Sequence, residues 1–177
     1  MEIPESEFTL EEIKKSSKNL EKAQKVAGAN LSNAALEDAD LVGISISDAD
    51  FSDADLRRAT LRDAGLVGAD FRAADLDGAD LREINLSEAD CSDADLREAN
   101  LQSANLGSAN FEGANLSGAD LSDATLIGAD LSGADLSGAT LTGASMGGLH
   151  VDGAIFDGAE LPDDVEAQLR EAGLLDD

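Results

Sequence analysis

Carboxylates are the side chains that this sequence holds in greatest number for chemistry. Its 177 residues include 38 Asp and Glu against 12 Lys and Arg, with a single His. Carboxylate oxygens are the ligands that Mg²⁺ and Ca²⁺ prefer, so a loose attraction of these cations is the first chemistry to consider. Their spacing matches neither the Asp–Gly loop of an EF-hand nor the nonapeptide of the calcium-binding β-rolls. The sequence therefore predicts no metal site.

Groups for nucleophilic or acid–base catalysis are scarce. His150 is the only histidine and Cys91 the only cysteine, and no His/Cys/Asp cluster suits a metal or a nucleophile. The glycines recur at intervals of five rather than as GxGxxG or GxxxxGK, so no phosphate-binding loop is expected. We predict that the protein is not an enzyme, has no catalytic residue and needs no cofactor. Cys91 is expected to fill the core rather than to act as a redox thiol.

The charge and the composition narrow the partners. A formal net charge of −26 opposes direct binding of a nucleic-acid backbone. No apolar run approaches the roughly 18 to 20 residues of a membrane span, and the stretch MEIPESEFTLEE lacks the basic and then apolar layout of a secretory signal. One cysteine cannot form an internal disulfide, so a cytoplasmic setting is the default expectation. Partners are expected among proteins, with neither nucleic acid nor membrane bound directly.

A repeat of five residues positions these side chains. From residue 31 to residue 161 every fifth residue is apolar, which gives 27 centre positions without an insertion. Ala stands two residues before the centre in 24 of the 27 repeats, and the residue between them is Asp eleven times and Asn six times. The second residue after the centre is most often Gly or Asp, types that tolerate the backbone angles of tight turns.

A period of five fits neither a helix nor a flat strand. Five residues advance about 500° around an α-helix, and in a strand an odd period sends successive centres to opposite faces. A short extended piece with its Ala and its centre pointing inward, followed by a turn, keeps the apolar residues together. If each turn is about 90°, four repeats close a square coil and the coils stack into a solenoid.

Written as A(D/N)LxG or A(D/N)LSx, the repeats resemble those of the pentapeptide-repeat family over about 133 residues. The resemblance implies an all-β fold, a right-handed quadrilateral β-helix, here of nearly seven coils over residues 29–161. With neighbouring strands about 4.8 Å apart, the stack would be roughly 32 Å tall. The resemblance also implies a type of partner, because some members imitate B-form DNA in width and charge and bind type II topoisomerases such as gyrase.

Residues twenty apart are expected to stack in columns along such a solenoid. One inner column holds Phe51, Phe71, Cys91 and Phe111. This column predicts a core ladder of stacked aromatic rings, with a small apolar thiol between two of them.

Both ends leave the repeat and are predicted to be short α-helical caps, over residues 1–28 and 162–177, on either side of the solenoid. Thr9 and Glu12 match a capping box, and all five lysines lie in the N-terminal segment. That segment either caps the rod or binds a partner through its lysines. Pro162 suits the first position of a C-terminal helix, which would cap the rod or join two copies, so both a monomer and a homodimer are open.

Two outward columns of carboxylates form the candidate partner-binding site: Asp50, Asp70 and Asp90, and next to them Asp55, Asp75 and Asp95. Carboxylates about 5 Å apart repel each other, so these columns call for an explanation. One explanation is a basic protein partner, for which they stand in for DNA phosphates. Another is a medium of high salt, which screens the repulsion. A third is the turn alone, since Asp and Asn both suit this position.

Two functions are the main ones that remain open from the sequence, beside a regulatory or enzymatic module whose helices would dock a separate catalytic chain. The first is a non-catalytic protein-interaction rod, a DNA mimic that acts on a type II topoisomerase or another DNA-binding protein. The alternative is a structural scaffold or spacer whose acidity is a halophilic adaptation, with no topoisomerase role. A specific site is expected in the first half of the rod, which holds all six of the rod's arginines. Among them, Arg58 is expected to face Asp38, and Arg57, Asp77 and Arg97 to share one column, as ordinary surface pairs.

Overall fold

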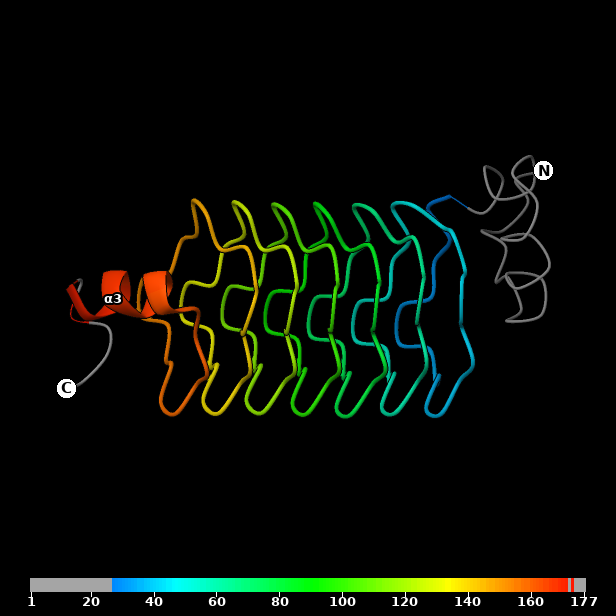
Figure 1. The fold of residues 1–177 in the computed structure, drawn as a ribbon. Coiled ribbons are helices and arrows are strands. Elements are labelled where there is room, and N and C mark those ends of the chain that lie inside the picture. Colours follow the sequence, from blue (N-terminus) through cyan, green and yellow to red (C-terminus); the bar gives the residue numbers. More distant parts are fainter. Residues whose placement is uncertain (1–26, 172, 174–177) are drawn as a thin grey trace, which may run out of the picture.

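The computed structural model describes residues 27–171 and residue 173. Figure 1 shows a rod of stacked coils with one helix, α3, at its C-terminal end. Twenty-three isolated parallel bridges each join two residues that lie twenty apart, from Asn30–Asp50 to Thr140–Glu160. A register of twenty with a repeat of five gives four repeats in each coil, so the coil has four sides. The right-handed sense that the resemblance implies stays a prediction.

Each side of a coil carries one bridging residue rather than a strand. Within residues 27–171, no strand of two or more consecutive residues is present. The extended piece that the sequence predicts is this short because the next turn begins at the centre itself. The N–H three residues after a centre donates to the carbonyl of that centre, as from Ala74 to Phe71 at 3.0 Å.

The backbone N–H groups of a repeat all find acceptors, as the repeat 69–73 illustrates. Its first N–H closes the preceding turn at 3.2 Å, its second donates to the preceding coil at 2.9 Å, and its third and fifth donate to the following coil at 2.6 and 3.0 Å. The fourth donates to the carboxylate of Asp70 at 3.0 Å. Because a buried or half-buried N–H without a partner is costly, this complete pairing stabilises a coil that has no continuous strand.

The interior of the rod consists of the centres and of the Ala residues two before them. Both sets are buried in the middle of the rod, while some members near its ends, such as Ala34 and Leu161, are partly buried. The described residues include no buried polar or charged side chain. Phe51, Phe71, Cys91 and Phe111 lie in one inner column and are at most 1% exposed. The rings of Phe51 and Phe71 stack with centroids 4.7 Å apart and planes 5° from parallel. Burial raises the pKa of the Cys91 thiol, which keeps it protonated and unreactive.

The turn after each centre requires a left-handed backbone conformation. Every residue two after a centre, from Asn33 to Gly158, has a positive φ, and 14 of these residues are not glycine. Only glycine adopts this conformation without steric cost, and none of the 14 is β-branched, the type that tolerates it least. The positive φ falls where the sequence predicts the turn.

The helix α3 spans Asp163–Glu171 and follows the last coil. Its Leu169 is buried in the same core cluster as the rod, and Val165 packs against that cluster. Asp163 and Asp164 lie in its first turn, where the helix dipole favours negative charge. The N-terminal cap predicted over residues 1–28 lies outside the described residues, except for its last two. No helix that the structure describes is long and apolar enough to span a membrane.

Two glycines separate the effect of φ from that of space. An added Cβ would meet no atom within 4 Å at either Gly138, where φ is +67°, or Gly147, where φ is not positive. We therefore expect Gly138→Ala to lower the free energy of unfolding by about 1 kcal/mol, and Gly147→Ala to leave it unchanged or raise it slightly. Urea unfolding monitored by circular dichroism measures both; equal effects of the two substitutions would contradict the requirement for a left-handed turn.

Candidate partner-binding surface

We name the four faces of the rod by their inner columns, each of which steps by twenty residues. The first face runs from Leu31 to Val151, the second from Leu36 to Phe156, the third from Leu41 to Leu161 and the fourth from Ile46 to Met146.

The Asp or Asn before a centre has a defined structural task. In 17 repeats its side-chain Oδ1 accepts a hydrogen bond from the backbone N–H two residues later. These 17 are all of the Asp and Asn residues at that position. Such an Asx turn can be made by either residue, because both carry the accepting oxygen. The turn therefore explains Asp or Asn at this position, but it does not explain the negative charge.

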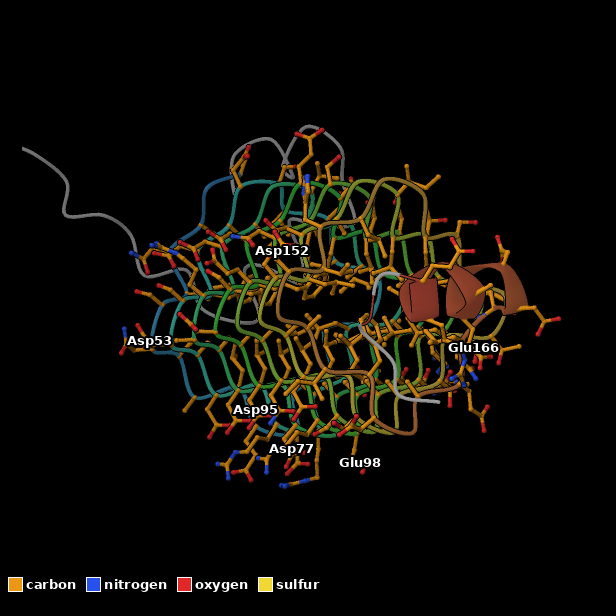
Figure 2. The ribbon with its side chains drawn as sticks, turned by 90° about the vertical axis from the view of Figure 1, so that its left-hand side faces the viewer. Asp53, Asp77, Asp95, Glu98, Asp152 and Glu166 are labelled. Atoms are coloured by element: carbon orange, nitrogen blue, oxygen red, sulfur yellow. The ribbon has the colours of Figure 1, made fainter. Side chains whose placement is uncertain are left out.

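The structure brings the predicted site residues together in two columns. On the first face, Asp70 forms bridges with Asp50 and with Asp90, and on the second face Asp75 forms bridges with Asp55 and with Asp95. Figure 2 shows Asp77, Asp95 and Glu98 pointing outward from one side of the rod. Whether either column binds a partner stays a prediction.

Three arginines pair with some of these six carboxylates. Arg72 donates to both carboxylate oxygens of Asp70, with Nη2 2.5 Å from Oδ2. Arg57 and Arg97 hold Asp55 and Asp95 in the same way, with Nη2 2.6 and 2.7 Å from Oδ2. Sequence reasoning missed these pairs, although the pattern Asp-x-Arg marks all of them and a fourth, Asp80 with Arg82. Both columns are thus less negative than their number of Asp residues suggests.

The surface pairs expected between coils are present in part. Arg58 contacts Asp38 at 2.9 Å, as the twenty-residue register predicts. Arg97 lies 3.9 Å from Asp77. Arg57 forms ion pairs with Asp55, at 2.6 Å, and with Asp75, at 3.6 Å, both of which lie outside the expected column with Asp77. These side chains are between 34% and 64% exposed, so each pair contributes little to stability.

A cluster of carboxylates lies on the first face beyond Arg72. No Lys or Arg follows on that face, and it carries Asp90, Asp93, Glu112 and others further along. A shallow groove of about 500 Å³ runs there, lined by Ser92, Asp93, Glu112, Gly113, Ser132, Gly133 and Asp152. Its carboxylates, Asp93, Glu112 and Asp152, make the groove acidic. Such a groove suits a cationic side chain from a partner.

Residues 27–171 contain no group of side chains arranged as a metal site. The structure places no three His, Cys, Asp or Glu side chains of this range so that they could hold a metal ion. His150 is exposed and lies in the same outward column as Asp130. The feature of this surface that a partner could recognise is therefore the arrangement of its charged side chains.

Comparison with known proteins identifies the repeat. The family model described as pentapeptide repeats matches residues 27–63, 64–102, 104–143 and 134–163, which together make up most of the chain. None of the curated proteins compared with this sequence matches it.

Three solved structures are similar to the chain. HetL of Nostoc sp. strain PCC 7120, a pentapeptide repeat protein involved in the regulation of heterocyst differentiation, is 34% identical over 76% of this chain and 77% of its own, with a TM-score of 0.35. A pentapeptide repeat protein of the Arabidopsis thaliana thylakoid lumen is 30% identical over 84% and 85%, with a TM-score of 0.41. Rfr23 of the cyanobacterium Cyanothece 51142 is 35% identical over 55% of this chain, with a TM-score of 0.38; the match spans 63% of Rfr23, less than two thirds of its length.

The Asp70–Arg72 pair gives the surface a measurable pH response. The Arg72 guanidinium holds the pKa of the Asp70 carboxyl below its usual value of about 3.9. Because the folded-state pKa is lowered, the stabilisation by Arg72 is present above pH 3.9 or so and is lost as the pH falls through the folded-state pKa. Unfolding of wild type and Arg72→Gln at several pH values should show a stability difference that disappears at the acid end.

A suitable control for that comparison is Arg62→Gln. Arg62 lies 4.0 Å from Asp63 and has no Asp two residues before it. NMR titration of the Asp70 carboxyl should give a higher pKa in Arg72→Gln than in either wild type or Arg62→Gln. Identical Asp70 titrations in all three proteins would show that the pair does not form.

Proposed function

The chain belongs to the pentapeptide-repeat family, and from that premise we propose that it is a non-catalytic protein-interaction rod whose acidic faces bind a basic protein surface. Members of this family are in general structural or interaction proteins rather than enzymes. In its sharpest form, the proposal makes the rod a mimic of DNA that acts on a type II topoisomerase or another DNA-binding protein. The first face, with Asp50, Asp70 and Asp90, is the proposed contact. The column Asp55, Asp75 and Asp95 flanks it on the second face.

The density of charge along the rod carries this proposal. Residues 29–161 hold 26 Asp and Glu and six Arg, a net charge of −20. Spread over a stack of roughly 32 Å, this is about one negative charge per 1.6 Å, against about one per 1.7 Å of B-form DNA. A protein that binds DNA through its phosphates would meet a similar linear charge on this rod.

The fixed orientation of the carboxylates also supports the proposal. The Asx turns hold the carboxylates before each centre in place, with Asp50 and Asp90 each accepting from the backbone N–H and the hydroxyl of a following serine. A carboxylate that is already oriented loses little side-chain entropy when a cation binds it. The acidic groove beyond Arg72 extends the same face.

Substitution of Asp by Asn tests the proposal, because Asn keeps the Asx turn and removes the charge. We expect the triple variant Asp50→Asn, Asp70→Asn, Asp90→Asn to bind its partner at least about tenfold more weakly. Affinity capture from a lysate at working salt and inhibition of gyrase supercoiling measure this loss. Circular dichroism should show an unchanged fold.

The matched control lies on the third face. Asp40→Asn, Asp80→Asn, Asp120→Asn removes the same charge from the same position of the repeat and likewise includes one Asp paired with an arginine. This control should retain binding. Equal losses in both triple variants would mean that net charge, not the first face, determines binding. If no topoisomerase is captured and supercoiling is unaffected by wild type, the mimicry is wrong.

A second candidate function is a scaffold or spacer adapted to high salt. The observation that favours it is the absence of Lys after residue 25, so that six Arg are the only cations among residues 29–161. A rod of this charge repels itself in dilute buffer, where the Debye length is about 30 Å at 0.01 M. In this version no partner needs to recognise the carboxylates.

Salt dependence of the melting temperature tests this second function. We expect the melting temperature to rise from dilute buffer to molar salt, because screening removes repulsion between neighbouring carboxylates. The third-face triple variant, with three fewer charges, should show a smaller rise. A melting temperature that is the same in dilute and molar salt would argue against salt adaptation and leave the binding function unaffected.

A further inference from the structure

The fourth face differs from the other three in its charge. Its outward column holds six uncharged residues that pair in the twenty-residue register: Ser45, Gly65, Asn85, Asn105, Thr125 and Ser145. The only charged residues on this face are Asp48 and Glu88, both at the turn position that forms its edge. On a rod with a net charge of −20, the fourth face is thus a nearly neutral strip along the whole length.

Most side chains on this face are small, and one large apolar side chain projects from it. Ile127 is 55% exposed, more than any other large hydrophobic residue among residues 27–171. One coil to either side, the same column holds Gly107 and Gly147. A Cβ added at Gly147 would meet no atom within 4 Å, and one at Gly107 would only touch its surroundings. The fourth face therefore carries a projecting side chain between two positions that hold no side chain.

A second copy of this chain fits such a surface best. Charge is the first reason, since the three acidic faces of two copies repel each other and the fourth face alone allows close approach. Shape is the second reason, because ridges about 4.8 Å apart match another stack of coils with the same spacing. In a two-fold pairing, Ile127 of each copy would lie over a glycine position of its partner, so that one surface supplies both the projection and the space for it.

We propose that the fourth face is a self-association surface, on which two rods pair weakly through the strip around Ile127. Six repeats give a strip about 29 Å long and about 13 Å wide, which is about 400 Å² per copy. The total of about 800 Å² lies below the roughly 1,200 Å² of a stable interface, so the pairing is concentration-dependent. The first face points away from the strip at a neighbouring side of the coil, so a paired rod still presents its acidic groove.

Sedimentation velocity in molar salt tests the proposal, since the Debye length is then about 3 Å and long-range repulsion is removed. Wild type should show a mass that rises with protein concentration, and Ile127→Glu should weaken this association at least about tenfold. The matched control is Ile155→Glu, at an exposed isoleucine on the opposite, second face; it should associate like wild type. A monomer at every concentration, or equal effects of both substitutions, would overturn the proposal.

Crosslinking locates the contact independently of stability. Asn105→Cys lies on the fourth face and Asn115→Cys on the second, and both residues occupy the same position of the repeat and accept one backbone N–H. The native Cys91 is buried and serves as the unreactive background. A short bismaleimide in molar salt should join two copies through residue 105 and not through residue 115. Crosslinking through residue 115 alone, or through neither, would contradict pairing on the fourth face, and association that survives Ile127→Glu would point to another contact such as α3.

Discussion

The pairing of backbone N–H groups is the constraint on which the rest of this structure depends. A coil with one bridging residue per side offers four backbone acceptors for the five N–H groups of a repeat. The N–H directly after the centre lies on the turn, and the side chain two residues earlier accepts it in 17 of the repeats. An outward position that favours Asp or Asn thereby recurs on every side of the rod.

The Asx turn accepts either a charged or a neutral side chain, and the sequence uses the negatively charged one more often. Asn would serve the turn as well as Asp, yet Asp is used eleven times and Asn six times. The left-handed position makes the same point more strongly. Glu83, Glu88 and Glu98 adopt a positive φ there, although Glu lacks the local hydrogen bonding that makes Asn and Asp tolerable in this region. Turn chemistry alone therefore does not explain the acidity of the rod.

The sequence predicts the parts of this structure that follow from the period. The centres, the inward Ala, the left-handed turns and the column of Phe51, Phe71 and Cys91 all depend on a spacing that is uninterrupted from residue 31 onward. It does not predict the pairs such as Asp70 with Arg72, because these depend on two side chains emerging on the same side of a turn, a geometry that a coil drawn as four flat sides does not contain. Nor does the period predict the neutral fourth face, because the period is the same on all four faces and does not distinguish one from another.

The uneven distribution of charge bears on the choice between the two functions. An adaptation to high salt acts on solubility and hydration, and these give no reason to leave one side of a rod neutral. All eleven Asp residues before a centre nevertheless fall on the first three faces, while the fourth column holds Ser, Gly, Asn and Thr. Binding on one side and contact with another copy on a second side would each require such a difference between faces. The distribution therefore favours a rod whose faces have separate tasks over a uniform acidic coat.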